Sequence, residues 1–379
     1  MQTIKTSKST PLENLLKAGE INDLAGVLGG GGDPLAVPLV FAELHLTDRC
    51  NSRCRFCNQT AGHQPNFEMS YANLERLTGE MKEAGLRGIR LSGGGEPTAH
   101  PEFLKIIKFF RGQDVQLFHI DTNGLLLREK VREQLLHSQP RKIHISLVAS
   151  DAERWSRETG LPKHKYDSLL SNLGRLVEEA KGLNTRIVVS FVIDEITYDS
   201  LLDMERLANH LGVAFFMHDL NTYGYGKKFY HDCMPVLVQA LDYLDTETLK
   251  SRFYLKVLSD LETARKKRLK VPPVDKEDSQ VLCLAPWCAT TIRPDFALHP
   301  CCAIVNRTMP LGSYAKSSIS SLRNGQRFRQ MRDDARQLFL SASTDSPQLC
   351  VLEEKCRGLC GPRNGLYSHH KVAQLVSNS

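Results

Sequence analysis

The sequence predicts an α/β protein: a partial (β/α)6 barrel of the TIM type, followed by a small cysteine-rich domain. Between residues 39 and 222, six short strand patterns alternate with helical patterns, which is typical of a parallel sheet with helical crossovers. Three of the 11 cysteines follow the first strand pattern at positions 50, 54 and 57. Seven more lie between Cys283 and Cys360, so a second domain of 276–379 is expected.

The elements are expected in the following order. Residues 1–38 form an N-terminal extension with an amphipathic helix over Leu12–Leu28, which ends where the glycines from Gly29 begin. Short apolar runs, the fifth of them rich in β-branched residues, predict strands over Phe41–Leu46, Gly88–Ser92, Val115–Ile120, Lys142–Val148, Arg186–Ile193 and Ala214–Met217. Helical spacing of apolar residues predicts helices over Tyr71–Leu86, Pro101–Phe110, Glu129–His137, Asp167–Ala180 and Asp199–Leu211. A mostly helical linker over 223–275 ends at a proline-rich stretch.

Composition and charge exclude several classes of protein. Apolar residues make up 41% and charged residues 24% of the chain, so it is not disordered. It has no apolar run long enough for an ordinary membrane span and no signal peptide, and a cytoplasmic protein is expected. The net charge of +6 is spread along the chain and does not indicate a nucleic-acid partner. Clustered cysteines in such a chain point to metal or catalysis instead of disulfides.

The first cysteine group has the spacing C-x3-C-x2-C, formed by Cys50, Cys54 and Cys57. Three thiolates on one loop can bind three irons of a four-iron cluster, leaving the fourth iron without a protein ligand. An open coordination position is what a reactive metal site needs. Zinc held by these cysteines and a fourth ligand is one alternative, and a disulfide pair is another.

These residues carry a family resemblance. The segment Leu46-Thr-Asp-Arg-Cys-Asn-Ser-Arg-Cys-Arg-Phe-Cys57, with Phe56 before the third cysteine, resembles the signature of radical S-adenosylmethionine (SAM) enzymes. The segment Ser92-Gly-Gly-Gly-Glu-Pro97, after the second strand, resembles that family's second motif. The resemblance implies a [4Fe-4S] cluster whose open iron binds SAM. Reductive cleavage of SAM would yield a 5′-deoxyadenosyl radical that takes hydrogen from a C–H bond. A flavodoxin or ferredoxin would supply the electron.

The resemblance also implies SAM-binding residues. Gly94, Gly95 and Glu96 would hold the methionine ammonium, since glycines allow close approach and a carboxylate can pair with the cation. A plain turn between strand and helix is the alternative. The remaining expected SAM contacts are Phe56, Asn123, Ser146 and Arg157. For Ser146 the alternative is a strand hydroxyl bonded within the protein, and for Arg157 it is a solvated charge on a helix.

The second cysteine group resembles the SPASM/twitch extension, which binds auxiliary iron–sulfur clusters in many such enzymes. Compared with the family's seven cysteines, two are missing, because Pro347 stands at one position and no cysteine follows Cys360. The resemblance leaves one complete ligand set for one auxiliary [4Fe-4S] cluster, formed by Cys283, Cys288, Cys301 and Cys360. Cys302 could replace Cys301. A second cluster would have only Cys350 and Cys356, and a structural zinc module is the alternative.

The function expected from this resemblance is hydrogen abstraction from a natural product, a sugar, aminocyclitol or peptide, leading to oxidation, epimerisation or bond formation. Epimerisation needs a thiol such as Cys233 to return a hydrogen atom. The 38-residue extension is shorter than the ~80 residues of a leader-peptide-binding domain, which favours a small substrate; a peptide maturase is the main alternative. An iron–sulfur sensor that no longer cleaves SAM and an RNA-modifying enzyme are further alternatives.

Overall fold

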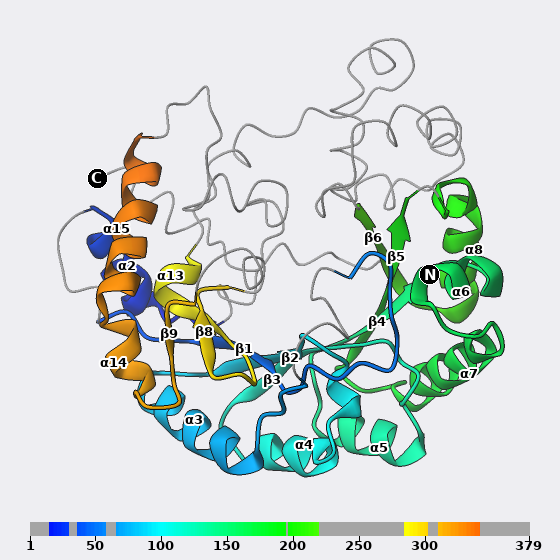
Figure 1. Ribbon diagram of the computed structural model, residues 1–379, viewed down its shortest axis with the longest axis horizontal. Coiled ribbons are helices and arrows are strands. Elements are labelled where there is room, and N and C mark those ends of the chain that lie inside the picture. Colours follow the sequence, from blue (N-terminus) through cyan, green and yellow to red (C-terminus); the bar gives the residue numbers. More distant parts are fainter. Residues whose placement is uncertain are drawn as a thin grey trace.

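The computed structural model contains a curved sheet with helices packed along its outer side (Figure 1). The residues that the structure describes are 15–29, 36–57, 66–194, 196–219, 284–301 and 310–341. Within these ranges, no helix has the length and apolar character needed to cross a membrane. The expected linker of 223–275 lies outside them, as do both of its boundaries, so the domain division stays a prediction.

Six parallel strands form the barrel part of the sheet. They are β1 (Phe41–His45), β2 (Gly88–Ser92), β3 (Gln116–Thr122), β4 (Lys142–Val148), β5 (Arg186–Ile193) and β6 (Ala214–Asp219). Each pairs in parallel with the next along the chain. Among the described strands, β6 lies at one edge and the sheet does not close on itself, which confirms the partial (β/α)6 barrel.

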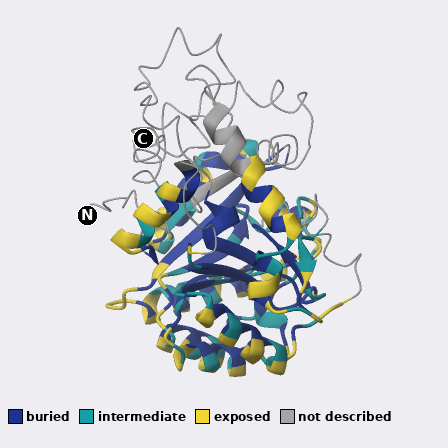
Figure 2. Cartoon of the chain, turned by 90° about the vertical axis from the view of Figure 1, so that its left-hand side faces the viewer, coloured by how far each residue is buried: buried dark blue, intermediate teal, exposed yellow. Residues whose placement is uncertain are grey.

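Helices cover the outer face of this sheet. They are α3 (Tyr71–Glu83), α4 (Phe103–Arg111), α5 (Glu129–His137), α6 (Ala152–Thr159), α7 (His164–Glu179) and α8 (Leu201–Leu211). Apolar strand residues such as Leu44 and Leu91 are fully buried against helix residues such as Leu74. Figure 2 shows the resulting pattern, with a dark-blue buried sheet and helices that turn their exposed residues outward. Burial of this continuous apolar layer fixes which strand faces turn outward.

The C-terminal region extends the same sheet. β7 (Ala289–Ile292) pairs in parallel with β1, and β8 (Ala297–His299) and β9 (Gly312–Ser313) follow as antiparallel strands. The sheet order is therefore β6-β5-β4-β3-β2-β1-β7-β8-β9. The described start of the cysteine-rich region is thus joined by strand pairing to the first strand of the barrel.

A second apolar cluster closes the end of the sheet where β1 begins. It joins α2 (Ala18–Gly29) to the short helix α13 (Ala285–Cys288). Leu24 and Leu28 of α2 are fully buried there, beside Phe41 and Phe118. The expected N-terminal helix is therefore present from Ala18 onward, and it packs on the barrel instead of standing apart.

The structure differs from the expected elements mainly at their ends. The helix expected from Pro101 begins at Phe103, after the short η1 turn (Pro97–Ala99). The third and sixth strands continue to Thr122 and Asp219, two residues beyond the expected ends. Four described helices were not expected: α6, α13, α14 (Ile319–Arg323) and α15 (Gln326–Ser341). α6 has few apolar residues, and its Asp151 cap supplies the start signal by accepting a hydrogen bond from the Arg154 amide.

Candidate functional site

Three predicted ligand cysteines lie on one loop that follows β1. Cys50, Cys54 and Cys57 are all half-buried. The Ser52 hydroxyl oxygen lies 3.3 Å from Cys50 Sγ and 3.5 Å from Cys54 Sγ, so two of the thiols converge on one hydroxyl. No disulfide forms among the described cysteines. Burial raises the pKa of Cys50 and raises the pKa of Cys54 to about 12. These thiols therefore stay protonated until a metal replaces their protons, and the donor set fits an iron–sulfur cluster.

Hydrogen bonds hold the cysteine loop against α6. The amides of Arg53 and Arg55 donate to the carbonyl oxygens of Thr159 and Glu158, at 2.9 and 2.8 Å. The Arg55 guanidinium also pairs with the Glu158 carboxylate at 3.2 Å. The loop is thus fixed on one side by the helix that follows β4.

The glycine-rich turn after β2 holds the other side of the loop. The Gly95 amide donates to the Thr47 carbonyl at 2.9 Å, and the Glu96 amide donates to the Arg49 carbonyl at 2.7 Å. A Cβ atom at Gly95 would lie 2.0 Å from the Arg49 carbonyl oxygen. Only glycine allows the two backbones to approach this closely, which explains one glycine of the motif without invoking a ligand.

The Glu96 side chain is 3% exposed and accepts hydrogen bonds from protein groups. Its Oε1 accepts from the Thr98 amide (3.1 Å), the Thr98 hydroxyl (2.5 Å) and the Thr122 hydroxyl (2.6 Å). Its Oε2 accepts from the Asn123 amide at 2.7 Å. Burial raises the pKa of Glu96 against the opposing effect of these hydrogen bonds. Glu96 therefore joins the turn after β2 to the end of β3.

Asn123 extends this connection back to the cysteine loop. Its Nδ2 donates to Asn51 Oδ1 at 2.6 Å, and its own Oδ1 accepts from the Leu125 amide at 3.1 Å. The residues following β1, β2 and β3 thus meet through one chain of hydrogen bonds. This is the edge formed by the carboxyl ends of the strands, where (β/α) barrels carry their chemistry.

The remaining predicted SAM contacts are arranged less tightly. Phe56 is half-buried and packs on the main core. Ser146 is half-buried on β4, opposite Ser190 of β5. Arg157 is exposed on α6, next to Glu158. Their roles as SAM contacts stay predictions.

Only two of the predicted auxiliary ligands lie among the described residues. Cys288 is fully buried at the end of α13, and Cys301 is 7% exposed shortly after β8. Both belong to the second apolar cluster. Burial raises the pKa of Cys288 to about 12. The remaining cysteines named above lie outside the described residues: Cys233, Cys283, Cys302, Cys350, Cys356 and Cys360.

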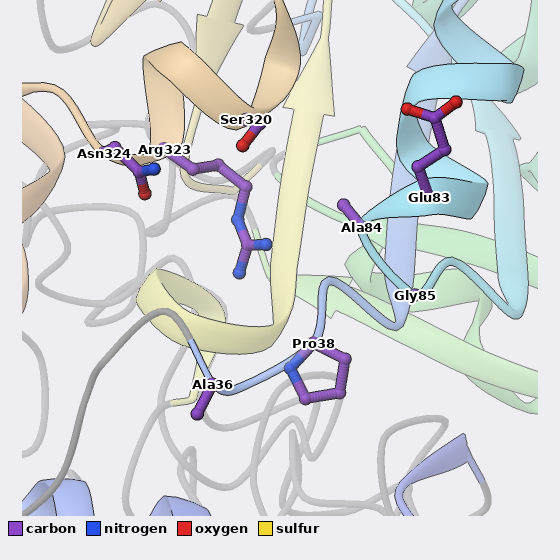
Figure 3. Close-up of a pocket in the computed structure, with 8 residues that line it drawn as sticks. All are labelled: Ala36, Pro38, Glu83, Ala84, Gly85, Ser320, Arg323 and Asn324. Carbon is purple, nitrogen blue, oxygen red and sulfur yellow. The ribbon is translucent and has the colours of Figure 1, made fainter.

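Two buried arginines hold the turn that carries Cys288. Arg323 Nη2 donates to the Trp287 carbonyl at 2.6 Å, and Arg332 Nε donates to the Pro286 carbonyl at 3.0 Å. Figure 3 shows the Arg323 side chain extending toward this turn beside a cavity of about 360 Å³. None of the predicted site residues lines that cavity. These two cations oppose the effect of burial on the Cys288 thiol and would favour its thiolate once a metal is bound, so this segment fits a thiolate-bound cluster.

A network of charged residues on the strands was not predicted as part of the site. Arg90 of β2 donates to Glu43 of β1 at 3.1 Å and to Asp121 of β3 at 2.6 Å. His144 Nδ1 of β4 lies 2.5 Å from Asp121 Oδ1, and His119 Nε2 lies 3.2 Å from the same oxygen. The signal in the sequence was ionisable residues within otherwise apolar strands, in alternation at Glu43-Leu-His45, His119-Ile-Asp121 and Lys142-Ile-His144.

Burial and pairing set the charges in this network. Burial alone would raise the pKa of Asp121, but Arg90 and His119 hold it well below its usual value. Burial lowers the pKa of His119 to about 3, and it also lowers the pKa of His144. The His119, Asp121 and His144 ligand atoms lie within 4.8 Å of one another. The Asp121 carboxylate already faces Arg90 and both histidines, so these side chains form a network of buried polar contacts across the strands.

Comparison with known proteins identifies two family matches. Residues 44–208 match the model of the radical SAM superfamily, and residues 283–357 match the SPASM iron–sulfur cluster-binding domain. Membership implies SAM and a SAM-binding [4Fe-4S] cluster for the first domain and auxiliary iron–sulfur clusters for the second. The individual proteins compared with this chain share 28% sequence identity with it or less.

Among curated proteins, GTP 3′,8-cyclase of Clostridium perfringens (strain SM101 / Type A) is 26% identical over 194 residues, covering 50% of this chain and 58% of the cyclase. GTP 3′,8-cyclase of Aquifex aeolicus (strain VF5) is 28% identical over 192 residues, covering 48% and 57%. The chain therefore spans just over half the length of these relatives.

Among solved structures, Streptococcus suis SuiB bound to precursor peptide SuiA has a TM-score of 0.58 at 17% identity, covering 86% of this chain and 72% of SuiB. Native anSMEcpe with bound AdoMet and Cp18Cys peptide has a TM-score of 0.57 at 15% identity, covering 89% and 96%. At these identities the likeness concerns the fold. The two family matches, and not this likeness, assign residues 44–208 to the radical SAM superfamily and residues 283–357 to the SPASM iron–sulfur cluster-binding domain.

Proposed function

We propose that this chain cleaves SAM reductively and removes a hydrogen atom from a C–H bond of an organic substrate. One observation carries the proposal. Three cysteines lie on one loop at the carboxyl end of β1, and hydrogen bonds join that loop to the turns after β2 and β3 and to α6. A loop held on both sides fits a reactive cluster better than a flexible structural zinc loop, because reaction geometry needs fixed ligands.

In this proposal, Cys50, Cys54 and Cys57 ligate the cluster and leave one iron open. When bound, the reduced cluster and SAM supply the hydrogen-abstracting radical. The backbone of Gly94 and Gly95 holds the methionine end of SAM. Glu96 fixes the turn and the end of β3.

Three further residues complete the proposed SAM site. Asn123 fixes the cysteine loop through Asn51. Ser146 and Arg157 are proposed to contact the ribose and the carboxylate of SAM. A guanidinium suits a carboxylate because it can donate paired hydrogen bonds.

For the substrate, we propose a peptide. SuiB bound to precursor peptide SuiA and anSMEcpe bound to Cp18Cys peptide share this fold over 86% and 89% of the chain. The GTP 3′,8-cyclases match only about half of it, and a nucleotide is the second candidate. A small natural product, favoured by the sequence alone, is the third.

The step after hydrogen removal distinguishes an oxidoreductase from an epimerase. Oxidation requires a base and an electron acceptor, and the auxiliary cluster is proposed as that acceptor. Epimerisation requires a thiol that returns hydrogen to the opposite face, and Cys233, outside the described residues, is the proposed donor. Deuterated water separates the two: epimerisation introduces one deuterium, whereas oxidation removes two hydrogens from the product.

The test of the proposal is SAM cleavage by the anaerobically reconstituted chain. With dithionite or a reduced flavodoxin, we expect 5′-deoxyadenosine to form, and to form faster when the substrate is present. A chain that holds iron and binds SAM but yields no 5′-deoxyadenosine would instead be an iron–sulfur sensor. Peptide and GTP pools are then compared as sources of the stimulation.

A further inference from the structure

Arg293 connects the C-terminal region to the loop that carries the cysteines. It directly follows β7, whose other end adjoins Cys288. Its Nη2 lies 3.2 Å from Asp48 Oδ1, and the side chains are 8% and 5% exposed. Asp48 lies two residues before Cys50. A buried ion pair therefore joins residues from the two family domains beside the proposed SAM site.

This pair packs against the glycine motif. A Cβ atom at Gly94 would lie 2.4 Å from Asp48 Oδ1 and 3.7 Å from Arg293 Nη1. The other oxygen of the carboxylate, Asp48 Oδ2, and Arg293 Nη1 are buried and have no hydrogen-bond partner among the described residues. A buried pair with unpaired atoms contributes little to folding stability compared with apolar residues of the same size. Fold stability alone does not explain these two residues.

Residues of its own region hold both the backbone and the guanidinium of Arg293. The Tyr314 hydroxyl donates to the Arg293 carbonyl at 2.6 Å, and Arg293 Nε lies 3.4 Å from Asp295 Oδ2. The Asp48 backbone is equally fixed, since its amide donates to the Phe67 carbonyl at 2.9 Å. Both partners thus have defined positions, and the contact between them sets the distance from β7 to the cysteine loop.

We propose that Arg293 is a positioning residue of the SAM site, supplied by the C-terminal domain. By holding Asp48 against Gly94, it keeps the glycine turn and the cysteine loop at the spacing that SAM requires. The inference rests on the proposed function, because it assumes that SAM binds at this turn. It adds that the barrel part alone does not form a complete SAM site.

The test compares SAM affinity among variants of the full chain, reconstituted anaerobically with iron and sulfide. Arg293→Gln should keep the iron content of the unmodified chain but weaken SAM binding, measured by equilibrium dialysis, at least about tenfold. It should also reduce the change that SAM causes in the EPR spectrum of the reduced cluster. Arg293→Lys, which keeps the charge, should recover part of the affinity.

Arg76→Gln is the matched control. Arg76 Nη2 donates to the carbonyl of Tyr314, the residue after β9, at 2.8 Å, so it also joins the barrel to the C-terminal region, but no described contact links it to the cysteine loop. Its SAM affinity should equal that of the unmodified chain. Equal losses in Arg76→Gln and Arg293→Gln would refute a specific role of Arg293, as would an unchanged Arg293→Gln. Failure of the unmodified chain to bind SAM would refute the proposed function itself.

If Arg293→Gln also loses iron, the double variant Asp48→Asn, Arg293→Gln separates the positioning role from loss of the cluster, because it leaves neither charge of this pair buried without its partner. Recovered iron with weak SAM binding supports the positioning role. Recovered iron with full SAM affinity contradicts it, and so does failure to recover iron, because the defect would then not act through Asp48.

Discussion

Replacing Glu96 by glutamine should uncouple the glycine turn from the end of β3. The carboxylate accepts from two backbone amides, those of Thr98 and Asn123, on opposite oxygens. A glutamine has only one carbonyl oxygen, so its NH2 group must face one of these donors. Rotating hydroxyls can adapt, but one buried amide loses its acceptor. Loss of a hydrogen bond to a charged group costs about 1.5–3 kcal/mol.

The assay measures both quantities that this loss affects. The free energy of unfolding of Glu96→Gln should fall by about 1.5–3 kcal/mol. If displacement of Asn123 shifts the cysteine loop so that the whole free-energy cost falls on SAM binding, SAM affinity falls roughly 10- to 150-fold, since 1.4 kcal/mol is a factor of ten. Glu102→Gln is the control, because the Glu102 side chain is 41% exposed and pairs with Lys105 at 3.1 Å, away from the bonds that join the glycine turn to β3. Unchanged stability and SAM affinity in Glu96→Gln would show that the hydrogen bonds do not hold the site.

Three further predictions concern the cluster, the turn and the histidines. Cys54→Ala should lose SAM cleavage and iron, measured as 5′-deoxyadenosine and iron per chain, whereas Cys288→Ala should retain part of the cleavage; the reverse order would contradict the assignment. Gly95→Ala should weaken SAM binding and lower the melting temperature, because its Cβ would lie 2.0 Å from a backbone carbonyl oxygen of the cysteine loop; Gly19→Ala, with nothing within 4 Å, should do neither. Burial lowers the pKa of His119 from 6.5 to about 3, so His119 stays neutral in the folded chain. The unfolded chain therefore binds more protons below pH ~6.5, and as the pH falls further the free energy of unfolding decreases by up to ~1.4 kcal/mol per pH unit. His119→Gln should flatten this loss in denaturant titrations at a series of pH values, and an equal slope in both proteins would count against a buried neutral histidine.

The strands and the cysteine loop could be predicted because their signals are local. Short apolar runs that alternate with helical patterns identify β1 to β6, and the position of Cys50 shortly after β1 follows from their order. The same holds for Gly94 and Glu96 after β2. Strand ends were less predictable, since β3 and β4 continue pairing through Asp121, a residue that ordinarily favours turns.

The long-range features had no local signal. Pairing of β7 with β1 joins Phe41 to Ala289, and no pattern within either segment indicates the other. The contact of Asp48 with Arg293 depends on that pairing. Likewise, the role of Glu96 as an acceptor for four protein donors depends on where β3 ends, so sequence reasoning assigned it only to the ligand.

The most direct test of the account is the EPR spectrum of the anaerobically reduced chain with SAM labelled at its amino nitrogen with ¹⁵N. An open iron on the loop of Cys50, Cys54 and Cys57 predicts a magnetic coupling between the label and the reduced cluster, lost in Cys54→Ala. Reduced iron–sulfur signals that stay uncoupled from saturating labelled SAM would contradict the central claim, as would a chain that binds only zinc at these cysteines.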